Sequence, residues 1–506
     1  MPTDASGPTR PLSHLLVAAL RRHHTAVAVV DQGAEHTYAE LDRLSAEIAG
    51  GLAARGIGPG RVVAVHAHRS WARCAAVLGA WRAGAGVVSV DPAMPAPRAA
   101  KIARFSDLVV RADATAPTGL GPAECTLKEL RTAPLEDVLE GPVGYVIPTS
   151  GSTGEPKSVA VPPRVLAALG EWHRARWTHD RPPHTLQASS IGFDVGYEEL
   201  VATWLAGARL VVVDDEERQD PFTLMEVIRE HRVARLFLPV VGLHALATAA
   251  AFEDDPMPDL REIAVAGERL VVNAEVREFC AAGGVTLVNE YGPSETHVVT
   301  EYRMAPADAA HWPDHPPIGR AVAAAELLCW SDGVLRPFTT GEQGELFVAG
   351  EPVGLGYLGD QELTDAKFRT LPHQDGTERR CYATGDLVRF DGTDLHFVAR
   401  ADDQLKVSGY RVEPGEVEAV LNAVAGVRRA VVVAVTLAGS TRLAAAYTRT
   451  GTADADAETL AEACAAHLPA YMVPKHFQVL EDLPVTANNK VDRARLRTLF
   501  GAGRTV

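Results

Sequence analysis

The feature that most constrains the fold of this chain is a regular alternation of short apolar runs with helical segments between residues 62 and 289. The intervening segments 71–84 and 271–284 are predicted helices, and Gly283 and Gly284 are suited to end the second one. Strand–helix alternation over this length predicts a layered α/β architecture with mostly parallel strands. The apolar runs are typical of buried strands and lie at 61–67, 208–215, 234–240, 261–267 and 285–292.

The pattern changes twice along the rest of the chain. After about residue 302, turn residues become frequent, which predicts a β-rich subdomain. From 401 onward, short helical patterns alternate with strands, which predicts a small α+β domain. The expected strands of these two parts lie at 344–350, 386–390, 394–400, 427–436, 442–448 and 476–481, and the helices at 415–424 and 456–467.

These patterns predict an α/β protein with two domains. The large layered core spans 1–401 and includes the β-rich subdomain at about 302–400. The small C-terminal domain spans 402–506. The segment 111–136, rich in alanine, threonine and proline, is predicted to be a surface loop.

The charge balance excludes two classes of partner. The chain has 49 lysines and arginines against 65 aspartates and glutamates, a formal net charge of −16. Binding to nucleic acid or to an anionic membrane would need clustered basic residues. The sequence has no apolar leader and no apolar run of about 18 residues. We therefore expect a soluble, cytoplasmic protein with no nucleic-acid or membrane partner.

A loop after a predicted strand has the composition of a phosphate-binding loop. The stretch PTSGSTGEPKS at 148–158 follows the apolar run GPVGYVI. Its glycines let backbone amides turn toward an anion, its hydroxyl side chains are donors, and Lys157 adds a cation. The loop departs from GxxxxGK[ST] because the glycine lies three positions early. A plain surface loop would explain the glycines but not this density of donors, so we predict a polyphosphate site.

Two further motifs are candidate parts of the same site. NEYGPSET at 289–296 ends a predicted strand, where ligands bind in open α/β sheets. Its Tyr291 offers an aromatic face, Ser294 a hydroxyl, and Glu295 a carboxylate that suits Mg²⁺. In YATGDL at 382–387, Asp386 has the chemistry to accept both ribose hydroxyls. Each motif, taken singly, also fits an ordinary turn.

Three other stretches carry weaker signals. GLGYLG at 354–359 matches the dinucleotide pattern GxGxxG, but no long helix follows, so we interpret these glycines as part of the β-rich subdomain. Arg400 and Asp402 lie at the predicted domain boundary, as hinge residues or a solvated linker would. Lys490 lies in a polar loop near the C-terminus, where most lysines are surface residues.

In their order along the chain, these motifs resemble those of the adenylate-forming superfamily, and most of all a free-standing adenylation domain of non-ribosomal peptide synthetases. Pro148, Ser158, Ala383, Ser408 and Asn489 depart from common family residues, and none of them removes a charge assigned to the chemistry. The resemblance runs nearly end to end, through HTYAEL (36–41), WRAGAGVVSVDP (81–92), PTSGSTGEPKS, FDVG (193–196), NEYGPSE, GELFVAG with GYL, YATGDL, ARADDQLKVSGYRVEPGEVE (399–418), LPAYMVP (468–474) and NNKVDR (488–493).

The resemblance implies a ligase that uses ATP and Mg²⁺. A carboxylate attacks the α-phosphorus, pyrophosphate leaves, and the acyl group then passes to a phosphopantetheine thiol as a thioester. Catalysis of this kind depends on positioning and on neutralising phosphate charge. By resemblance, Lys490, Glu295 and Ser294 are catalytic, and Glu295 also holds Mg²⁺. The resemblance also implies that Asp402 is the hinge about which the small C-terminal domain turns as a mobile lid. The implied ATP-binding residues are Thr149, Ser150, Gly151, Ser152, Thr153, Gly154, Lys157, Tyr291, Asp386 and Arg400.

The resemblance also implies a substrate pocket. Asp194 matches the aspartate that pairs with the amine of an amino acid. Because an unpaired buried carboxylate is costly, Glu198 and Glu290 favour a basic or imidazole side chain, and the pattern is similar to histidine-selecting pockets. Arginine, ornithine, lysine and a cyclic guanidine stay open, as does a glutamate that faces solvent or an internal arginine. The full set is Asp194, Val195, Glu198, Phe237, Ala264, Ala266, Glu290, Val298 and Val299.

Partners follow from the same resemblance. The chain shows no carrier-domain or condensation motif, so we expect a stand-alone loading enzyme, or one excised from a longer chain, with a separate carrier protein. Some relatives need an MbtH-like helper. Three alternatives remain: an acyl- or aryl-CoA ligase of the same superfamily, a loading enzyme for a β-amino acid, and a catalytically silent binding module.

Overall fold

The chain divides into two compact units in the computed structural model. Unit 1 comprises Met1–Pro92, Phe105–Ile147 and Ser158–Ala401, and unit 2 comprises Ala93–Arg104, Pro148–Lys157 and Asp402–Val506. The two predicted domains, with a hinge at Asp402, stay a prediction. The structure describes residues 10–111, 128–129, 142–149, 156–190, 192–253, 257–400, 405–407, 410–437, 440–450, 455–484 and 491–502.

Unit 1 contains a nine-stranded sheet in the order β15-β14-β13-β12-β11-β9-β10-β1-β2. The six strands from β13 to β1 run parallel, and β2, β14 and β15 run antiparallel to their neighbours. The five apolar runs predicted as strands supply β3 of a second sheet and four of these strands. The bounds are β1 Val27–Asp31, β2 Ala34–Thr37, β9 Thr185–Gln187, β10 Leu210–Val212, β11 Arg235–Pro239, β12 Glu262–Ala266, β13 Thr286–Tyr291, β14 Thr300–Met304 and β15 Arg320–Ala321.

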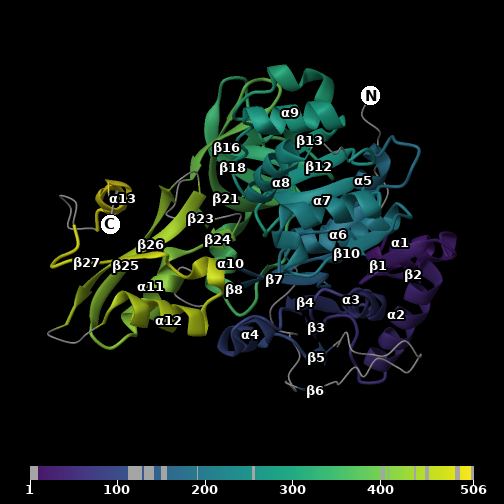
Figure 1. Cartoon of the computed structure of the whole chain (residues 1–506), viewed down its shortest axis with the longest axis horizontal. Coiled ribbons are helices and arrows are strands. Elements are labelled where there is room, and N and C mark those ends of the chain that lie inside the picture. Colours follow the sequence, from purple (N-terminus) through teal and green to yellow (C-terminus); the bar gives the residue numbers. More distant parts are fainter. Residues whose placement is uncertain are drawn as a thin grey trace. The chain divides into compact units, whose positions relative to one another are not determined.

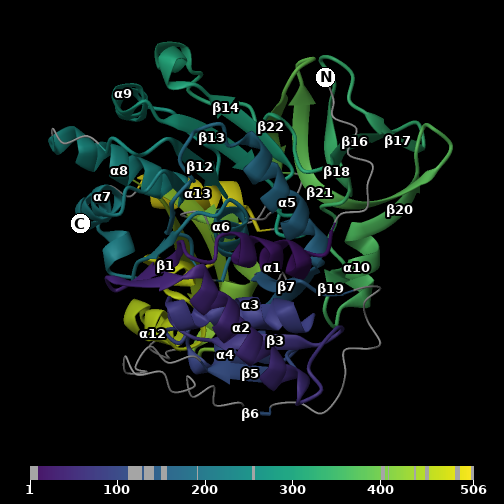
Figure 2. The same ribbon diagram turned by 90° about the vertical axis from the view of Figure 1, so that its right-hand side faces the viewer.

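Helices α7 (Pro221–Glu230), α8 (Val240–Phe252) and α9 (Ala274–Gly283) pack on this sheet through one apolar cluster (Figures 1 and 2). The Asn273 side chain caps the start of α9, and Gly284 takes a left-handed conformation at its end, as the sequence predicted. A short 3₁₀ helix, Glu217–Gln219, precedes α7, and a second, Pro306–His311, contacts α9.

A seven-stranded sheet has the order β19-β8-β7-β4-β3-β5-β6. Its bounds are β3 Val62–His66, β4 Gly86–Val90, β5 Leu108–Arg111, β6 Lys128–Glu129, β7 Tyr145–Thr149, β8 Lys157–Val161 and β19 Gly356–Tyr357. The prediction of a loop over 111–136 is wrong at Arg111, which ends β5, and at β6, which pairs with β5. The remainder of that segment lies outside the described residues.

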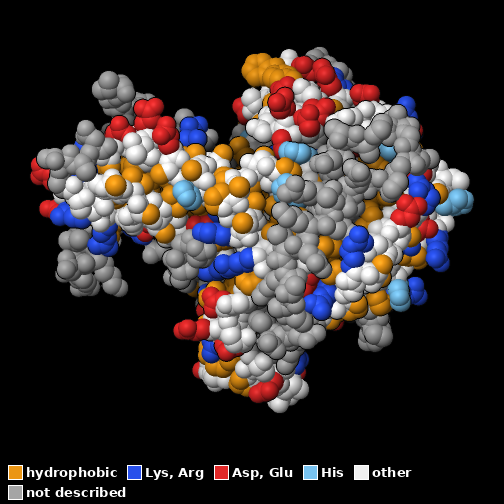
Figure 3. Space-filling model, turned by 90° about the horizontal axis from the view of Figure 1, so that it is seen from below, with side chains coloured by type: hydrophobic (Ala, Val, Ile, Leu, Met, Phe, Trp, Pro, Cys, Tyr) orange, Lys and Arg blue, Asp and Glu red, His pale blue; other side chains and the backbone are white. Residues whose placement is uncertain are grey.

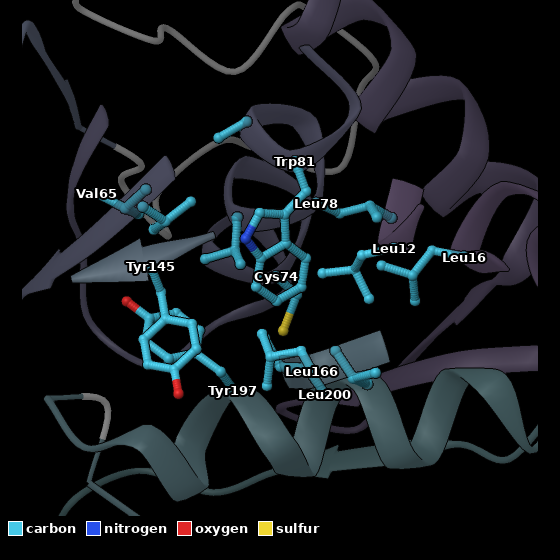
Figure 4. Packing of buried hydrophobic residues seen from close by; sticks show 14 of the residues in the cluster. Leu12, Leu16, Val65, Cys74, Leu78, Trp81, Tyr145, Leu166, Tyr197 and Leu200 are labelled. Carbon is cyan, nitrogen blue, oxygen red and sulfur yellow. The ribbon is translucent and has the colours of Figure 1, made fainter. Parts of the chain in front are cut away.

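The largest apolar cluster of unit 1 joins parts of both sheets through five helices: α1 Leu12–Arg22, α2 Tyr38–Ala53, α3 Trp71–Ala83, α5 Pro163–Arg176 and α6 Asp194–Leu205. Figure 4 shows Trp81, Tyr145 and Tyr197 packed against leucines from α1, α3, α5 and α6. The α2 helix begins in a capping box made by Thr37 and Glu40. Burial of these side chains fixes α5 and α6 side by side against the nine-stranded sheet, and both helices carry site residues.

The β-rich part of unit 1 is a six-stranded antiparallel sheet. Its order is β17-β16-β18-β21-β20, with β22 paired to β21. The GLGYLG glycines differ from expectation, because Gly356 and Tyr357 form β19 of the seven-stranded sheet and not part of this one. The bounds are β16 Ala325–Ser331, β17 Val334–Pro337, β18 Gln343–Gly350, α10 Gln361–Lys367, β20 Phe368–Pro372, β21 Glu378–Phe390 and β22 Leu395–Arg400.

Unit 2 has a three-stranded sheet, β25-β26-β27, and a hairpin of β23 and β24. Val417, Leu421 and Leu460 join its main apolar cluster. The predicted C-terminal helices and strands are confirmed within one to two residues. The bounds are α4 Ala96–Ala103, β23 Leu405–Val407, β24 Tyr410–Val412, α11 Pro414–Asn422, β25 Val427–Leu437, β26 Ser440–Arg449, α12 Ala457–His467, a 3₁₀ helix Ala470–Met472, β27 His476–Val479 and α13 Arg493–Ala502.

Charged side chains of both signs are interspersed over the face shown in Figure 3. Within the described ranges, every helix falls short of the length and apolar character that crossing a bilayer requires.

Candidate functional site

The end of β13 is the centre of the candidate site. Glu290 and Tyr291 are its last two residues, and successive strand residues point to opposite faces. The Glu290 side chain pairs with Arg176 of α5, whereas the Tyr291 hydroxyl donates to Asp386 of β21. One strand end therefore separates two groups of residues. We name them after the sequence predictions: the nucleotide side (Tyr291, Asp386, Arg400, Glu295) and the side-chain pocket (Asp194, Glu198, Glu290 and their lining).

On the nucleotide side, Asp386 is held by two donors. The Tyr291 hydroxyl lies 2.5 Å from Asp386 Oδ2, and Arg400 Nη1 lies 2.8 Å from Oδ1. Asp386 and Arg400 are directly opposite in the β21–β22 ladder, so strand register sets their pairing. Burial and the Asp386 charge raise the pKa of Tyr291 well above its usual value, so the phenol stays neutral. The structure thus brings together three of the predicted ATP-binding residues.

Glu295 lies in the turn after β13 and is fully buried. The Tyr357 hydroxyl donates to its Oε1 over 2.7 Å, and the Tyr382 hydroxyl lies 3.5 Å from that of Tyr357. A side chain on Gly354 would approach the Glu295 carbonyl oxygen to 2.6 Å, so the glycine is required there. An oriented carboxylate of this kind fits a hard cation such as Mg²⁺. The GLGYLG segment, which gave no functional signal in the sequence, therefore supports the predicted metal ligand.

The turn between β13 and β14 closes tightly. A side chain on Gly292 would approach the His297 carbonyl oxygen to 1.7 Å, and His297 has a positive φ of 58°. Non-glycine residues in this region carry strain that surrounding contacts must offset. Ser294 is partly buried in the same turn. The strained turn places the buried His297 imidazole beside Glu198, with Nδ1 3.8 Å from Oε2.

The apolar lining of the side-chain pocket is partly assembled as predicted. Val195, Phe237 and Ala264 belong to one apolar cluster, and Phe237 and Ala264 are paired across β11 and β12. Ala266 ends β12. Val298 and Val299 are buried but belong to two other apolar clusters. Asp194 is the first residue of α6, and one Asp194 oxygen accepts the Val195 backbone N–H.

Glu198 lies one helical turn after Asp194 and is buried. His173 of α5 lies 2.6 Å from Glu198 Oε1 through its Nε2 atom. Within the described part of the chain, Glu198 Oε2 has no hydrogen-bond partner. Burial raises the pKa of Glu198 well above its usual value, and Glu290 and Asp194 raise it further. These effects favour the protonated form of the Glu198 carboxyl, and Arg176 and Arg235 oppose them.

Glu290 differs from Glu198 because it has an internal arginine. Arg176 Nη2 lies 3.4 Å from Glu290 and 3.2 Å from Glu262, and Nη1 pairs closely with Glu301. Arg303 Nη1 lies 2.9 Å from Glu262. Burial raises the pKa of Glu290 to about 7, and Arg176 opposes the rise. The sequence left open that one glutamate faces solvent or an internal arginine. Glu290 faces an internal arginine, Arg176.

His173, Glu198 and Glu290 offer ligand atoms within 4.8 Å of one another, a spacing that a metal ion could use. Arg176 lies against two of the three, since its Nη2 donates to His173 Nδ1 over 3.2 Å and also pairs with Glu290. A guanidinium in this position opposes a second cation. Burial also lowers the pKa of His173 well below its usual value, with help from Arg176 and Arg235.

Part of the predicted site lies outside the described residues, namely Ser150, Gly151, Ser152, Thr153, Gly154, Asp402 and Lys490. Thr149 ends β7 and Lys157 begins β8, so these two residues border the predicted phosphate loop on two strands of one sheet.

Comparison with known proteins decides the family. The model of AMP-binding enzymes matches residues 16–358, and that of the AMP-binding enzyme C-terminal domain matches 416–490. The chain belongs to the AMP-binding enzyme family. This AMP-binding enzyme is 35% identical to tyrocidine synthase 2 of Brevibacillus parabrevis over 99% of the chain, but it spans 14% of that protein's length.

Solved structures show the same fold for this AMP-binding enzyme. An artificially fused adenylation–PCP di-domain of Klebsiella oxytoca, NpsA-ThdA, is 25% identical with a TM-score of 0.78, and the match covers 94% of both chains. The amide bond synthetase McbA of Marinactinospora thermotolerans is 25% identical with a TM-score of 0.80, and the match covers 96% of this chain and 99% of McbA. The predicted fold class, that of adenylate-forming enzymes, is confirmed.

Four site residues of this AMP-binding enzyme were not found by sequence reasoning: His173, Arg176, His297 and Tyr357. His173 and Arg176 lie on α5, which contains no motif. The structure shows that they follow the buried Leu166, Leu169 and Gly170 on the same helix. His297 adjoins the motif NEYGPSET, and Tyr357 lies within GLGYLG.

Proposed function

We propose that this chain activates an amino acid with Mg-ATP to an aminoacyl-AMP and transfers it as a thioester to the phosphopantetheine arm of a separate carrier protein. The observation that carries the proposal is the end of β13, where Glu290 faces the side-chain pocket and Tyr291 faces Asp386. An amino acid bound in the side-chain pocket and a nucleotide bound on the nucleotide side would meet at this strand end. Relatives among peptide synthetases support the carrier-protein partner.

In the first step, an oxygen of the amino acid's carboxylate forms a bond to the α-phosphorus, and the bond to pyrophosphate breaks. The substrate is already ionised, so the chain needs to position and neutralise rather than remove a proton. Asp386 would accept the ribose hydroxyls, and Tyr291 would stack on the adenine. Mg²⁺, held by Glu295, would supply positive charge beside the phosphates. In the second step, the carrier thiol attacks the acyl carbon and AMP leaves.

The amino acid itself would be recognised by charge. Asp194 would pair with its amine, since the ion pairs of the described residues include none to Asp194. The second carboxylate, Glu198, favours a basic or imidazole side chain, with histidine as the first candidate. Ornithine, lysine, arginine and β-amino acids belong in the same assay, because each presents a donor or cation to the pocket.

The direct test is ATP–pyrophosphate exchange across a panel of basic, neutral, β- and non-proteinogenic amino acids, with and without an MbtH-like protein. We expect exchange with at least one amino acid that has a basic or imidazole side chain. No exchange with any amino acid, with the helper present, would favour the silent binding module. Thioester formation with coenzyme A but not with a carrier protein would favour the CoA ligase.

A second prediction concerns Lys490, which would bridge the substrate carboxylate and the α-phosphate. We expect Lys490→Ala to abolish exchange yet to leave thioester formation from a supplied aminoacyl-AMP intact, because the lysine acts on charge that is present in the first step alone. The measurement is exchange beside carrier loading from synthetic adenylate. Ordinary exchange by the variant would remove Lys490 from the mechanism.

A further inference from the structure

The buried charges around the side-chain pocket are unevenly compensated. Glu262, Glu290 and Glu301 have arginine partners in Arg176 and Arg303. A third arginine, Arg235, is buried near the same carboxylates and donates to Thr185. Among the described residues, the basic side chains close enough to Glu198 for an ion pair are two histidines, His173 and His297. Glu262, Glu290 and Glu301 thus form ion pairs with Arg176 or Arg303. Arg176 and Arg235 lie near enough to Glu198 to oppose the rise in its pKa, but neither forms an ion pair with it among the described residues.

Both histidines beside Glu198 have their protonation fixed by a neighbour. Arg176 can only donate, so His173 Nδ1 is the acceptor in their contact and His173 carries its proton on Nε2. His173 Nε2–H therefore donates to Glu198 Oε1 over 2.6 Å. His297 Nδ1 accepts the Val298 backbone N–H over 2.8 Å, so this atom has no proton to give to Glu198. The nitrogen that faces Glu198 Oε2 is an acceptor, and Oε2 receives no donor from it.

The geometry points to a proton-linked receptor for the side chain of the substrate: Glu198 Oε2 takes one cationic donor group, while His173, itself set by Arg176, positions Glu198 from a helix outside the predicted pocket. This inference rests on the proposed function and specifies its substrate class. Glu290 contributes less because Arg176 already meets its charge. The receptor accordingly takes a side chain with one positive group rather than two.

The exchange of charge balances without any further reactant. In the empty pocket the buried Glu198 carboxyl holds a proton, which the raised pKa of this group supports. A side chain that is already cationic, such as that of arginine, ornithine or lysine, then forms an ion pair with the carboxylate, and the proton leaves to solvent. Glutamine or norleucine can form no such ion pair. Binding of a cationic amino acid should therefore release up to about one proton per site.

Calorimetry in two buffers of different ionisation enthalpy measures this release directly. The titrants are arginine, ornithine, lysine and norleucine added to the full chain with a non-hydrolysable ATP analogue and Mg²⁺. We expect proton release with whichever cationic amino acid gives the highest exchange, and none with norleucine. Glu198→Gln should abolish the release. Equal release by Glu198→Gln, or binding without release, would overturn the inference.

The positioning role of His173 has a readout that a structural role would not move. His173→Phe removes the N–H donor, so Glu198 should hold its proton more tightly. We expect the KM for the cationic amino acid to rise on the order of tenfold at neutral pH, with little change in the KM for ATP. The acid limb of its kcat/KM profile should move to higher pH, because ionised Glu198 is the form that binds the cation.

Two variants separate this role from a loss of packing. His173→Gln keeps a donor near Glu198 Oε1 and should return the acid limb toward the wild-type position. His36→Phe alters a half-buried histidine that stacks on Trp71 and should leave the profile unchanged. If His173→Phe does not fold, His173→Gln and the wild-type proton release still test the inference. An unmoved acid limb in folded His173→Phe would contradict it.

The failure of this inference is distinguishable from failure of the proposed function. Exchange that is strongest with a neutral apolar amino acid would keep the adenylation proposal and overturn the Glu198 receptor. A zinc-selective chelator, with Mg²⁺ retained, should leave the amino-acid preference unchanged. Loss of the preference on chelation, restored by added Zn²⁺, would instead assign His173, Glu198 and Glu290 to a metal ion and overturn the receptor.

Discussion

The nucleotide side and the side-chain pocket, which lie on opposite faces of the end of β13, use buried carboxylates in opposite ways. On the nucleotide side, Asp386 receives donors at both oxygens, and Glu295 is oriented by Tyr357. In the side-chain pocket, Glu198 is held at one oxygen by His173 and is unpartnered at the other among the described residues. The proposed function explains the difference, because the nucleotide would be the same for every amino acid and its receptors could be fully fixed in advance. In our proposal, the unpartnered atom is where the variable half of the substrate is recognised.

The largest effect expected from this comparison is at Asp386. Asp386→Asn removes the charge that pairs with Arg400 in a mostly buried ion pair, and removing one partner of such a pair costs about 3–5 kcal/mol. We expect kcat/KM for ATP to fall by about 10²- to 10³-fold, by the same factor with every accepted amino acid. Exchange measured across the panel checks this.

The control for Asp386→Asn is Asp394→Asn, since Asp394 pairs with the largely exposed Arg320. Its effect should be within about twofold. A fall in kcat/KM of Asp386→Asn that depended on the amino acid would contradict the separation of the nucleotide side from the side-chain pocket.

A smaller and selective effect is expected in the pocket. Replacing both Glu198 and Glu290 by glutamine removes the charge but keeps the shape, so the preference for a basic over a neutral amino acid should fall about 10- to 100-fold. The KM for ATP should change much less. Relative exchange rates over the panel provide the measurement, and unchanged relative rates would remove both residues from substrate recognition.

The smallest of the three effects belongs to Tyr357. Tyr357→Phe removes the hydroxyl that orients Glu295, while the ring stays packed against Phe368. A hydrogen bond to a charged group contributes about 1.5–3 kcal/mol. If Glu295 can re-orient around the metal, only part of this free energy would be lost. We expect the Mg²⁺ concentration for half-maximal exchange to rise about fivefold. Phe368→Leu, which keeps this hydroxyl, is the matched control; an equal shift in both variants would assign the effect to packing.

Much of the fold was predictable because its signals are local. The apolar runs that became β11, β12 and β13 are short, continuous and bounded by turn residues, and burial on both faces requires that composition. The motif residues Tyr291, Asp386 and Glu295 were likewise found as ligand candidates. Their partners were not, because Tyr357 and Glu295 are 62 positions apart and His173 and Glu198 are 25 apart. No periodicity in the sequence couples such positions.

The difference between Glu198 and Glu290 could not be predicted from the sequence, because it depends on how the helices pack. It offered two equivalent glutamates, and it could not indicate that Arg176 would meet Glu290 while Glu198 would meet His173. Both partners lie three positions apart on α5 and so project from the same side of that helix. The asymmetry between the glutamates is thus a product of how α5 packs beside α6.

The position of His173 and Arg176 on α5 has a consequence for anyone who would redesign this enzyme. Exchanging the residues that line the cavity for those of a relative with another preference would leave an imidazole and a guanidinium behind the new surface. A transplanted aliphatic pocket would then enclose a histidine that has lost its carboxylate partner, while Arg176 would keep Glu262 and Glu301 but lose Glu290. A transplanted anionic pocket would enclose a neutral histidine in the place of a cation. A redesign should therefore replace the pocket-lining residues and the end of α5 together.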